Sequence, residues 1–374
     1  MVRKSAIVIG AGIVGIATAR ALALKGYAVQ VYERNYKASG ASVRNFGMVW
    51  PIGQPAGKQY ERAIRSRNCW KEIGDRSKLW YDPVGSMHLA YNQTEWVMLQ
   101  ESFEIFRNEG REIALLNRHQ VCAISGIAKE KNCLGGLYSR EEIIVDPGEA
   151  IHYLPEYLQE NLQIKFNWGT AVTHVSAGKI SYGLHEAHAD LIVICSGSDF
   201  RTLYPEEFEK YPLTKCKLQM MRLMEEGSAR IGPALCGGLS LIHYPSFKAA
   251  ASSASLKKYF EETMPEYLKW GIHVMVSQNH TGLLTIGDSH EYGLSPDPFD
   301  RQYINDLILK YLDQFTVLKN PRLVETWNGV YGKLTNQQTE LFISPEPGVY
   351  IINGVGGNGM TMSFGITEEL VAQI

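Results

Sequence analysis

Three short segments of the chain are apolar at nearly every position, and each ends at a glycine or a small polar residue. They are residues 5–9, 190–196 and 349–352. Apolar runs of this length are typical of strands buried on both faces, as in a parallel sheet. Residues 14–25 are rich in Ala and Leu and stop at Gly26, which predicts a helix, and residues 28–33 predict the next strand. The chain is therefore predicted to begin with a β–α–β unit.

The middle of the chain has a different pattern, in which apolar and polar residues alternate. Alternation predicts the half-buried strands of an antiparallel sheet, and we expect them at residues 86–91, 217–224, 273–278 and 283–287. Helices are predicted at residues 61–73, 94–116, 149–160 and 300–315, and a short strand at 142–146. Residues 35–60 contain several glycines and prolines and predict a long, ordered loop. We expect an α/β fold, α+β overall, whose two domains are each discontinuous in sequence.

Composition and charge exclude several classes of protein. The chain has 374 residues, with 37 Lys and Arg against 39 Asp and Glu, so the formal net charge is −2. A nucleic-acid-binding protein would show a basic excess, and no segment approaches the roughly 18 apolar residues that span a bilayer. We expect no signal peptide, because the first residues lead straight into an apolar strand and a glycine-rich segment. The six cysteines form no C-x-x-C pair. We therefore expect a cytoplasmic protein.

The first strand is followed at once by a dinucleotide-binding fingerprint. Gly10-Ala11-Gly12-Ile13-Val14-Gly15 has the form G-x-G-x-x-G, and the second strand ends at Glu33. In this context the glycines permit a tight turn, a close approach to a pyrophosphate and close packing of helix on strand. The helix N-terminus would hold the pyrophosphate, and Glu33 would accept hydrogen bonds from a ribose. The fingerprint alone leaves FAD and NAD open.

Two later segments favour FAD. Residues 190–200 form a buried strand that ends in small residues, and residues 348–365 form a strand, a loop with four glycines and a helix that begins near Met360-Thr361. A glycine-rich helix start at the far end of the chain can hold a second polar group, for which the flavin pyrimidine edge is suitable. Such a helix end would also stabilise an anionic reduced flavin.

These segments together resemble the D-amino-acid oxidase, glycine oxidase and sarcosine oxidase family. The resemblance is carried, in this order, by the fingerprint, by Ser39-Gly40-Ala41-Ser42, by the strand at 190–200 and by the C-terminal Gly-Val-Gly-Gly-Asn-Gly-Met-Thr. Two stretches, residues 42–48 and 287–292, are similar to a subgroup proposed to act on aminophosphonates. The resemblance implies oxidation of a C–N bond of a small acidic amine to an imine, by hydride transfer to flavin N5, and then hydrolysis.

The resemblance also implies the domains and the residues that bind the cofactor. Residues 1–85, 145–215 and 325–374 are predicted to form a Rossmann-like FAD-binding domain with a parallel sheet, and 86–144 and 216–324 a substrate-binding domain with a mainly antiparallel sheet. We predict that FAD is bound, without a covalent link, by Gly10, Gly12, Ile13, Val14, Gly15, Glu33, Arg34, Ser42, Arg44, Asn45, Phe46, Gly47, Val172, Ser196, Gly197, Trp327, Gly329, Gly356, Gly357, Asn358, Gly359, Met360 and Thr361.

Four residues are candidates to anchor the acidic group of the substrate. Arg44 lies in the segment expected to pass the flavin ring, and its guanidinium suits a carboxylate or a phosphonate. His243 and His290 are expected to meet, with His273, around one site that would suit a polar anion. Gln219 lies on a strand that lines the active site in the glycine oxidase group. Each of these side chains also has a plain structural interpretation, and Arg44 alternatively contacts FAD itself.

Other features limit the interpretation. Sarcosine-oxidase-like members carry a lysine that helps oxygen react with reduced flavin, and Thr285 stands at the approximately matching position here. Whether oxygen is the electron acceptor therefore stays open. The sequence also leaves the oligomeric state open.

His185 and His188 lie three residues apart rather than four, so we predict no metal site. An FAD-dependent 2-hydroxy-acid oxidoreductase and a non-catalytic flavin-binding subunit are the alternatives to an amine oxidoreductase.

Overall fold

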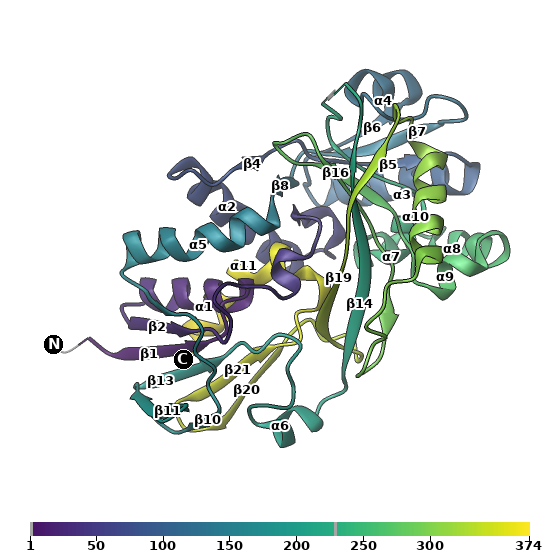
Figure 1. Cartoon of the computed structure of the whole chain (residues 1–374). Coiled ribbons are helices and arrows are strands. Elements are labelled where there is room, and N and C mark those ends of the chain that lie inside the picture. The colour runs from purple at the N-terminus through teal and green to yellow at the C-terminus, as the bar shows by residue number, and fades with distance from the viewer. Residues whose placement is uncertain (1–2, 228–229) are drawn as a thin grey trace.

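The computed structural model describes residues 3–227 and 230–374, and a six-stranded sheet lies at one end of the molecule (Figure 1). The order of strands is β20 (Leu341–Glu346), β21 (Val349–Asn353), β13 (Leu191–Ile194), β1 (Ser5–Ile9), β2 (Ala28–Tyr32) and β9 (Lys165–Asn167). All neighbours are parallel except β20, which pairs antiparallel with β21. The parallel sheet predicted from the apolar runs is confirmed.

Burial of both faces explains why these strands are apolar throughout. Val8 and Val193 point to one face, which is covered by α1 (Ile13–Leu24), α5 (Pro147–Leu162) and α11 (Gly359–Ala372). Ile7 and Ile192 point to the other face and pack on Ile180. That face is covered by a small antiparallel sheet of β10 (His174–Ser176), β11 (Lys179–Tyr182) and β12 (His185–His188). Figure 1 shows the helices above the six-stranded sheet and this small sheet below it.

A second, larger sheet stands beside the first and is mainly antiparallel. Its path is β18 (Glu291–Tyr292), β14 (Leu213–Met224), β17 (Leu284–Gly287), β16 (Met275–Gln278), β15 (Ala234–Cys236), β5 (Ser86–Ala90), β7 (Gly135–Ser139) and β6 (Ile113–Asn117), and β19 (Arg322–Leu334) also pairs with β14. Only the β15–β5 pair is parallel along this path. The long strands β14 and β19 lie at the boundary between the two sheets (Figure 1).

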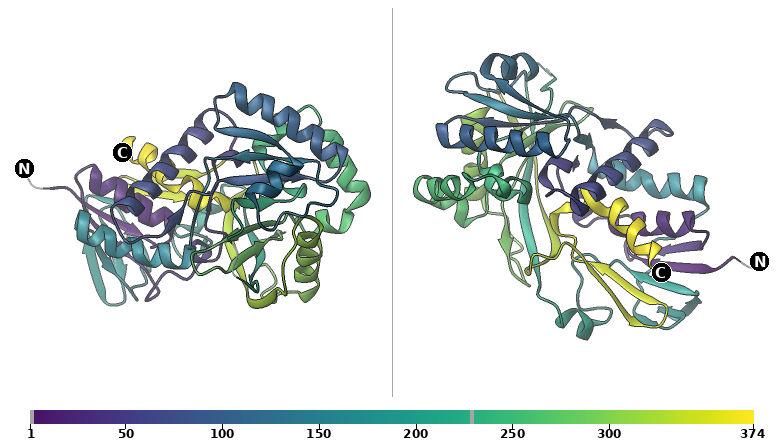
Figure 2. Two further views of the ribbon diagram at one scale, coloured as in Figure 1. Left: turned by 90° about the horizontal axis from the view of Figure 1, so that it is seen from above. Right: turned by 180° about the vertical axis from the view of Figure 1, so that it is seen from behind.

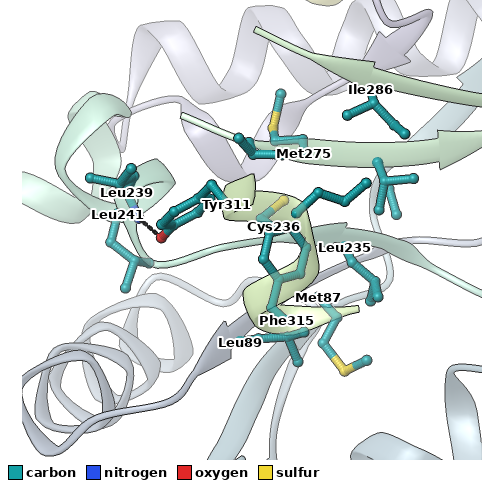
Figure 3. Close-up of a cluster of buried hydrophobic side chains, with 14 of the residues drawn as sticks. Met87, Leu89, Leu235, Cys236, Leu239, Leu241, Met275, Ile286, Tyr311 and Phe315 are labelled. Atoms are coloured by element: carbon teal, nitrogen blue, oxygen red, sulfur yellow. Dashed lines mark hydrogen bonds between the residues drawn. The ribbon is translucent and has the colours of Figure 1, made fainter. Parts of the chain in front are cut away.

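The core of this second half lies between its sheet and a set of outer helices. Figure 3 shows Met87, Leu235, Met275 and Ile286 from neighbouring strands packed together with Tyr311 and Phe315. The hydroxyl of Tyr311 accepts a hydrogen bond of 3.0 Å from the backbone N–H of Leu239. The outer helices are α3 (Gln93–Asn108), α7 (Leu239–His243), α8 (Ser253–Thr263), α9 (Pro265–Lys269) and α10 (Gln302–Phe315). In Figure 2, α3, α8 and α10 lie on the side away from α1 and α11.

Shorter elements connect the two halves. A three-stranded sheet is formed by β3 (Met48–Val49), β8 (Ile143–Val145) and β4 (Tyr81–Asp82), next to α2 (Lys58–Asp75). The remaining short helices are η1 (Ala41–Val43), η2 (Pro51–Gly53), α4 (Arg118–Ile124), α6 (Pro205–Glu209), η3 (Pro245–Ala249) and η4 (Gly356–Asn358). The segment 35–60 is thus ordered, as expected, but it contains short elements rather than loop alone.

One predicted helix is wrong in its second half. The helix expected over residues 94–116 ends at Asn108, and Ile113–Asn117 form strand β6. Gly110 has φ +78°, and the backbone N–H of Arg111 bonds to the carbonyl of Phe106 at 3.1 Å. This is the Schellman arrangement, which ends a helix at a left-handed glycine. The apolar residues after it suit a helix or a strand, and pairing with β7 decides for the strand.

Both sheets draw their strands from separate parts of the chain. The six-stranded sheet takes strands from near both ends and from residues 165–194, whereas β5 to β7 and β14 to β19 belong to the larger sheet. The domain boundaries given above stay a prediction. No helix within residues 3–227 and 230–374 has both the length and the apolar character needed to span a bilayer.

A buried arginine joins α2 to α11, the helix whose first turn faces the cleft described below. Arg62 is 1% exposed, and its Nε and Nη2 donate to the two carboxylate oxygens of Glu369 at 2.8 and 2.9 Å. Its Nη1 donates to Glu340 at 2.9 Å. The two helices cross so closely that a Cβ on Gly365 would lie 2.2 Å from the Arg62 carbonyl oxygen. The arginine therefore neutralises two carboxylates at a crossing that leaves no room for adjustment.

We predict that Arg62→Ala lowers the free energy of unfolding by about 3 kcal/mol, because two carboxylates lose a buried partner. Urea denaturation at pH 7 measures this. Arg65→Ala is the matched control, since exposed Arg65 reaches Glu369 only at 3.5 Å and should cost less than about 1 kcal/mol. Hydrogen bonding to Arg62 lowers the pKa of Glu369 from 4.5 to about 2. The stabilisation is therefore present above pH 4.5 and is lost as the pH falls towards 2. Equal stability of wild type and Arg62→Ala at pH 7 would contradict the prediction.

Candidate functional site

The carboxyl ends of the central parallel strands open onto one elongated cleft that continues to β19. This is where open α/β sheets bind their ligands. The cleft is lined by residues from β1, β2, β13, β21, β19, the loop after β2 and the start of α11, among them Gly10, Gly12, Ile13, Val14, Gly15, Glu33, Arg34, Ser42, Arg44, Asn45, Val172, Ser196, Gly197, Gly329, Gly356, Gly357, Gly359 and Met360. All eighteen of these were predicted from the sequence.

The glycines of the fingerprint are required by close backbone packing. Gly10 has φ +104°, and a Cβ there would lie 2.3 Å from the carbonyl oxygen of Cys195 at the end of β13. A Cβ on Gly15 would lie 1.9 Å from the carbonyl oxygen of Gly10. Real side-chain atoms do not approach this closely, so the turn exists only with glycine at both positions. It brings the N-terminus of α1 to the cleft with room for a diphosphate.

The start of α1 has side chains arranged around it in a way that fits a dinucleotide site. The N-cap residue, Gly12, has no side chain that could cover the helix end. The backbone N–H of Ile13 donates to Ser42 Oγ at 2.9 Å, and that of Ala11 donates to Glu33 Oε2 at 2.9 Å. Glu33 is thereby held at the end of β2, where its carboxylate lines the cleft. The glycines and Glu33 therefore lie where the fingerprint requires them, and the Ser42 hydroxyl lies beside the helix start.

The Glu33 end of the cleft has the character of an adenosine site. Arg34 and Asp199 form an ion pair of 2.6 Å there, and Thr170 and Val172 add to the wall. Burial opposes ionisation of Asp199, but hydrogen bonds from Thr202, Arg201 and Arg34 outweigh it and lower its pKa to about 2. With Glu33 and an ionised Asp199 in this wall, a 2′-phosphate would be repelled, which favours FAD or NAD over NADP.

The other end of the cleft is formed by α11 and β19. Gly356, Gly357, Gly359 and Met360 present the N-terminus of α11, a helix of 14 residues with no acidic residue in its first turn. The hydroxyl of Tyr331 would lie 3.3 Å from a Cβ on Gly357, so the glycine leaves a narrow space beside the phenol. Burial raises the pKa of Tyr331 well above its ordinary value, so the phenol stays neutral. A helix N-terminus and a neutral donor suit the carbonyl edge of a flavin.

The loop with Arg44 crosses the cleft at this end. The amide of Asn45 holds the loop, donating to the carbonyls of Ala41 and Ser42 and accepting from the N–H of Gly47 at 2.8 Å. Arg44 lines the cleft and is exposed, and its Nη1 donates to the carbonyl of Asn328 at 3.1 Å. Arg34 and Arg44 are the two basic residues among the described lining, and of these only Arg34 forms an ion pair within the described chain.

Five residues predicted to bind FAD lie outside the lining of the cleft. Asn358 accepts from Gln54, and Thr361 Oγ1 accepts from the backbone N–H of Trp50 at 2.9 Å. The indole of Trp327 lies under the guanidinium of Arg222. Phe46 is buried against Gly287, and Gly47, with φ +69°, packs on the carbonyl of Val145. These are the contacts that the five residues make within the protein, and their direct contact with FAD stays a prediction.

The hydrogen bonds of Gln219 do not support its predicted role as a substrate anchor. Its side chain is buried and bonds to the start of α10: Nε2 donates to the carbonyl of Arg301 and to Asn305 Oδ1 at 2.9 Å, and Oε1 accepts from the N–H of Arg301. Gln219 is therefore bonded to a helix start rather than free for a ligand. The strand β14 does reach the cleft, but through Leu218, the preceding residue, which faces the opposite side.

The three histidines come together as expected. The ring centroids of His243 and His273 are 3.7 Å apart, those of His243 and His290 are 4.8 Å apart, and those of His273 and His290 are 5.2 Å apart. His243 ends α7, His273 precedes β16 and His290 precedes β18. Burial lowers the pKa of His290 to about 4 and those of His243 and His273 well below 6.5. All three are therefore neutral at pH 7.

This histidine cluster (His243, His273 and His290) does not line the cleft but lies behind its wall. The ring of His290 stacks near that of Tyr292, and the hydroxyl of Tyr292 accepts from Lys333 Nζ at 3.4 Å. Lys333 is two residues from Tyr331 on β19, and Tyr331 lines the cleft. Tyr292 and Lys333 thus connect the cluster to the wall at the α11 end.

Some lining residues carried no usable signal in the sequence. Asp199 and Thr170 lie in loops after strands, Leu218 looks like any core residue, and Asn353 ends β21, where its amide donates to Ser196 Oγ at 3.1 Å. An asparagine directly before the C-terminal glycines could have been noticed, because small polar residues at strand ends commonly face such clefts. The other three are placed only by tertiary contacts.

The fold and the cleft define a dinucleotide-binding protein of the flavoprotein class. The chain belongs to the DAO family of FAD dependent oxidoreductases, whose pattern it matches over residues 5–373. FAD is therefore the cofactor that the cleft is built to hold. Its dinucleotide would extend from Glu33 past the start of α1 to Tyr331 and α11.

Similar proteins agree on the fold. L-proline dehydrogenase from P. horikoshii superimposes with a TM-score of 0.81 at 19% identity, over 99% of this chain and 94% of that one. Glycine oxidase from Geobacillus kaustophilus superimposes with a TM-score of 0.76 at 17% identity, over 100% and 94%. By sequence, the tRNA 5-methylaminomethyl-2-thiouridine biosynthesis bifunctional protein MnmC of Hahella chejuensis is 23% identical over 257 residues. That match covers 63% of this chain and only 39% of MnmC.

We predict that Gly15→Ala weakens FAD binding at least about tenfold, or ~1.4 kcal/mol, because its Cβ would collide with the Gly10 carbonyl at 1.9 Å. Titration of the apoprotein with FAD, followed by flavin fluorescence, measures the dissociation constant. Gly293→Ala is the control, since nothing lies within 4 Å of a Cβ there. A dissociation constant unchanged in Gly15→Ala would show that the turn can open without cost.

Proposed function

We propose that the protein oxidises the C–N bond of a small amine that bears an acidic group. The α C–H would transfer hydride, the product imine would add water, and a carbonyl compound and an amine or ammonia would leave. Bound FAD supplies the hydride acceptor. The family supports an oxidoreductase, and the names of L-proline dehydrogenase and glycine oxidase, which share the fold, support an amine substrate.

The position of Arg44 is the observation that supports an acidic group on the substrate. It is exposed in the cleft at the end formed by Tyr331 and α11, and within the described residues no carboxylate neutralises it. A guanidinium can bind a carboxylate or a phosphonate through two parallel hydrogen bonds. Its Nη1 bond to the Asn328 carbonyl uses one donor and leaves others for a ligand. Arg44 would hold the acid so that the α-carbon faces the flavin.

An aminophosphonate is the substrate class we favour within this proposal. The two stretches that carry that resemblance, residues 42–48 and 287–292, touch in the fold: a Cβ on Gly287 would lie 3.3 Å from Phe46 Cζ. A phosphonate also offers three acceptor oxygens, one more than a carboxylate, to a multi-donor guanidinium. Amino acids and N-methyl amino acids stay within the proposed class.

The other residues of this end would orient the substrate and exclude water. Tyr331 stays neutral and can donate a hydrogen bond without carrying charge. Leu218 and Met360 supply apolar surface. Removal of hydride from a neutral amine is assisted by the nitrogen lone pair, so this scheme needs no side-chain base. Binding, orientation and electrostatics are the protein's contribution.

A panel of candidate substrates tests this proposal. We expect small acidic amines to bleach the flavin absorbance anaerobically, with an aminophosphonate active at lower concentration than the amino acid of equal length. The product solution should contain ammonia, or methylamine from an N-methyl substrate. Bleaching by 2-hydroxy acids without ammonia would favour the hydroxy-acid oxidoreductase. No bleaching by any compound would favour the non-catalytic subunit.

We predict that Arg44→Ala raises the half-saturating concentration of the best substrate roughly 10–100-fold, which corresponds to loss of a charged hydrogen-bond pair of about 1.5–3 kcal/mol. Anaerobic reduction measures it, and FAD content should stay normal. Arg44→Lys is the matched variant, because it keeps the charge but not the planar fork of donors. Its half-saturating concentration should lie between those of wild type and Arg44→Ala. Loss of FAD in Arg44→Ala would instead assign the residue to the cofactor loop, and unchanged reduction would place the anchor elsewhere.

A further inference from the structure

The histidine cluster has no role in the chemistry proposed above. Its three imidazoles each offer a nitrogen, and these ligand atoms all lie within 4.8 Å of one another. The side chains come from three separate segments, at residues 243, 273 and 290. His273 and His290 are buried, and His243 is half-buried. Three convergent imidazoles, two of them buried, are an arrangement that a bound ligand would explain.

A hydrogen bond fixes which ring nitrogen of His290 carries the proton. Nδ1 of His290 lies 3.0 Å from the carbonyl oxygen of Gly271. A carbonyl only accepts, so Nδ1 carries the proton and Nε2 of the neutral ring is left with a lone pair. Nε2 of His273 lies 3.1 Å from Asp288 Oδ1. Neither Nδ1 of His273 nor Oδ1 of Asp288 has a hydrogen-bond partner within the described chain. The His273 ring therefore has a nitrogen available to a ligand.

These orientations are held by the backbone. The N–H of His273 bonds to the carbonyl of Asp288 at 3.2 Å, and the N–H of Asp288 bonds to the carbonyl of His273 at 2.9 Å. The N–H of His290 bonds to the carbonyl of Trp270 at 2.8 Å. Gly271 has φ +56°, and a Cβ there would lie 2.8 Å from His290 Cβ, so glycine permits the close approach. The backbone therefore places the Gly271 carbonyl and the segments from which the His273 and His290 rings extend.

We propose that His243, His273 and His290 bind one divalent metal ion of the zinc class. Three neutral imidazoles with one open position are a known ligand set for zinc, and imidazole also suits cobalt, nickel and copper. Asp288 and the Gly271 carbonyl would be the outer partners that orient the rings, as in carboxylate–histidine–zinc arrangements. The nitrogens of a tetrahedral zinc site lie about 3.4 Å apart, so the rings would close in slightly on binding.

The same geometry disfavours an anion in the cluster. An anion needs N–H groups that point at it, whereas the ring N–H of His290 points outward, to the carbonyl of Gly271. The nearby ammonium of Lys333 lies over the ring of Tyr292 and bonds to its hydroxyl, rather than to the histidines. The earlier expectation that these histidines receive the acid of the substrate is therefore replaced by a cation site.

Cobalt binding provides a test that does not depend on turnover. The purified flavoprotein is dialysed against chelator and titrated with Co²⁺, whose d–d absorbance at long wavelength is free of oxidised flavin. We expect saturation at one ion per chain, with competition by Zn²⁺. Inorganic phosphate titrated into the metal-free protein should give no binding at the cluster. Absence of any saturable Co²⁺ or Zn²⁺ binding by the wild-type protein would overturn the proposal.

Variants assign the site. His273→Ala and His243→Ala should each abolish the one-to-one Co²⁺ spectrum, and Asp288→Asn, which alters an outer partner only, should weaken binding about 10–100-fold. The double change His185→Ala with His188→Ala is the matched control, because it removes two exposed histidines of β12 and should leave binding unchanged. FAD content and thermal melting check the fold of each variant. Tight binding that survives His243→Ala and His273→Ala but is lost in the control would overturn the assignment.

Discussion

The packing of the Gly10–Gly15 turn against the end of β13 is the contact on which the rest of the site depends. Two backbone segments approach so closely there that a Cβ on Gly10 would lie 2.3 Å from the Cys195 carbonyl oxygen. This contact sets the distance between α1 and the sheet and thereby aims the donors of the first helical turn at the cleft. Ser42 accepts from the N–H of Ile13 and Glu33 from the N–H of Ala11, so the loop after β2 takes its position from the same turn.

A second constraint joins the two halves of the molecule. β14 and β19 pair antiparallel from Leu213–Leu334 to Met224–Arg322 and form one rigid ribbon that belongs to the larger sheet. Gly329 on this ribbon lies so close to the loop after β2 that a Cβ would be 2.9 Å from the Arg44 carbonyl oxygen. Tyr331, two residues further, reaches the start of α11. The ribbon therefore sets the end of the cleft at which a substrate would meet the cofactor.

Charge is distributed unevenly along this cleft, and the distribution suggests a division of roles. Glu33, Asp199 and the Arg34 that pairs with Asp199 lie at one end, and Arg44, which forms no ion pair within the described chain, lies at the other. The histidine cluster stands behind the Arg44 end and contributes no positive charge, because burial keeps its imidazoles neutral. A cation bound there would add positive charge close to the proposed substrate site. The proposed metal site and the proposed amine oxidation are nevertheless independent, since either can hold without the other.

The sequence by itself determined the β–α–β unit, the fingerprint, the buried parallel strands and the C-terminal glycine loop. Each is a local pattern whose meaning depends on neighbours within a few residues. Where local information was ambiguous, prediction failed: residues 113–117 suit a helix or a strand, and only pairing with β7 decides. Gln219 was expected to face a ligand, but α10, more than 80 residues later, takes its amide. The tautomer of His290 was likewise decided by tertiary structure, because a ring nitrogen is a donor or an acceptor according to the atom beside it, and the oxygen beside Nδ1 comes from the Gly271 carbonyl.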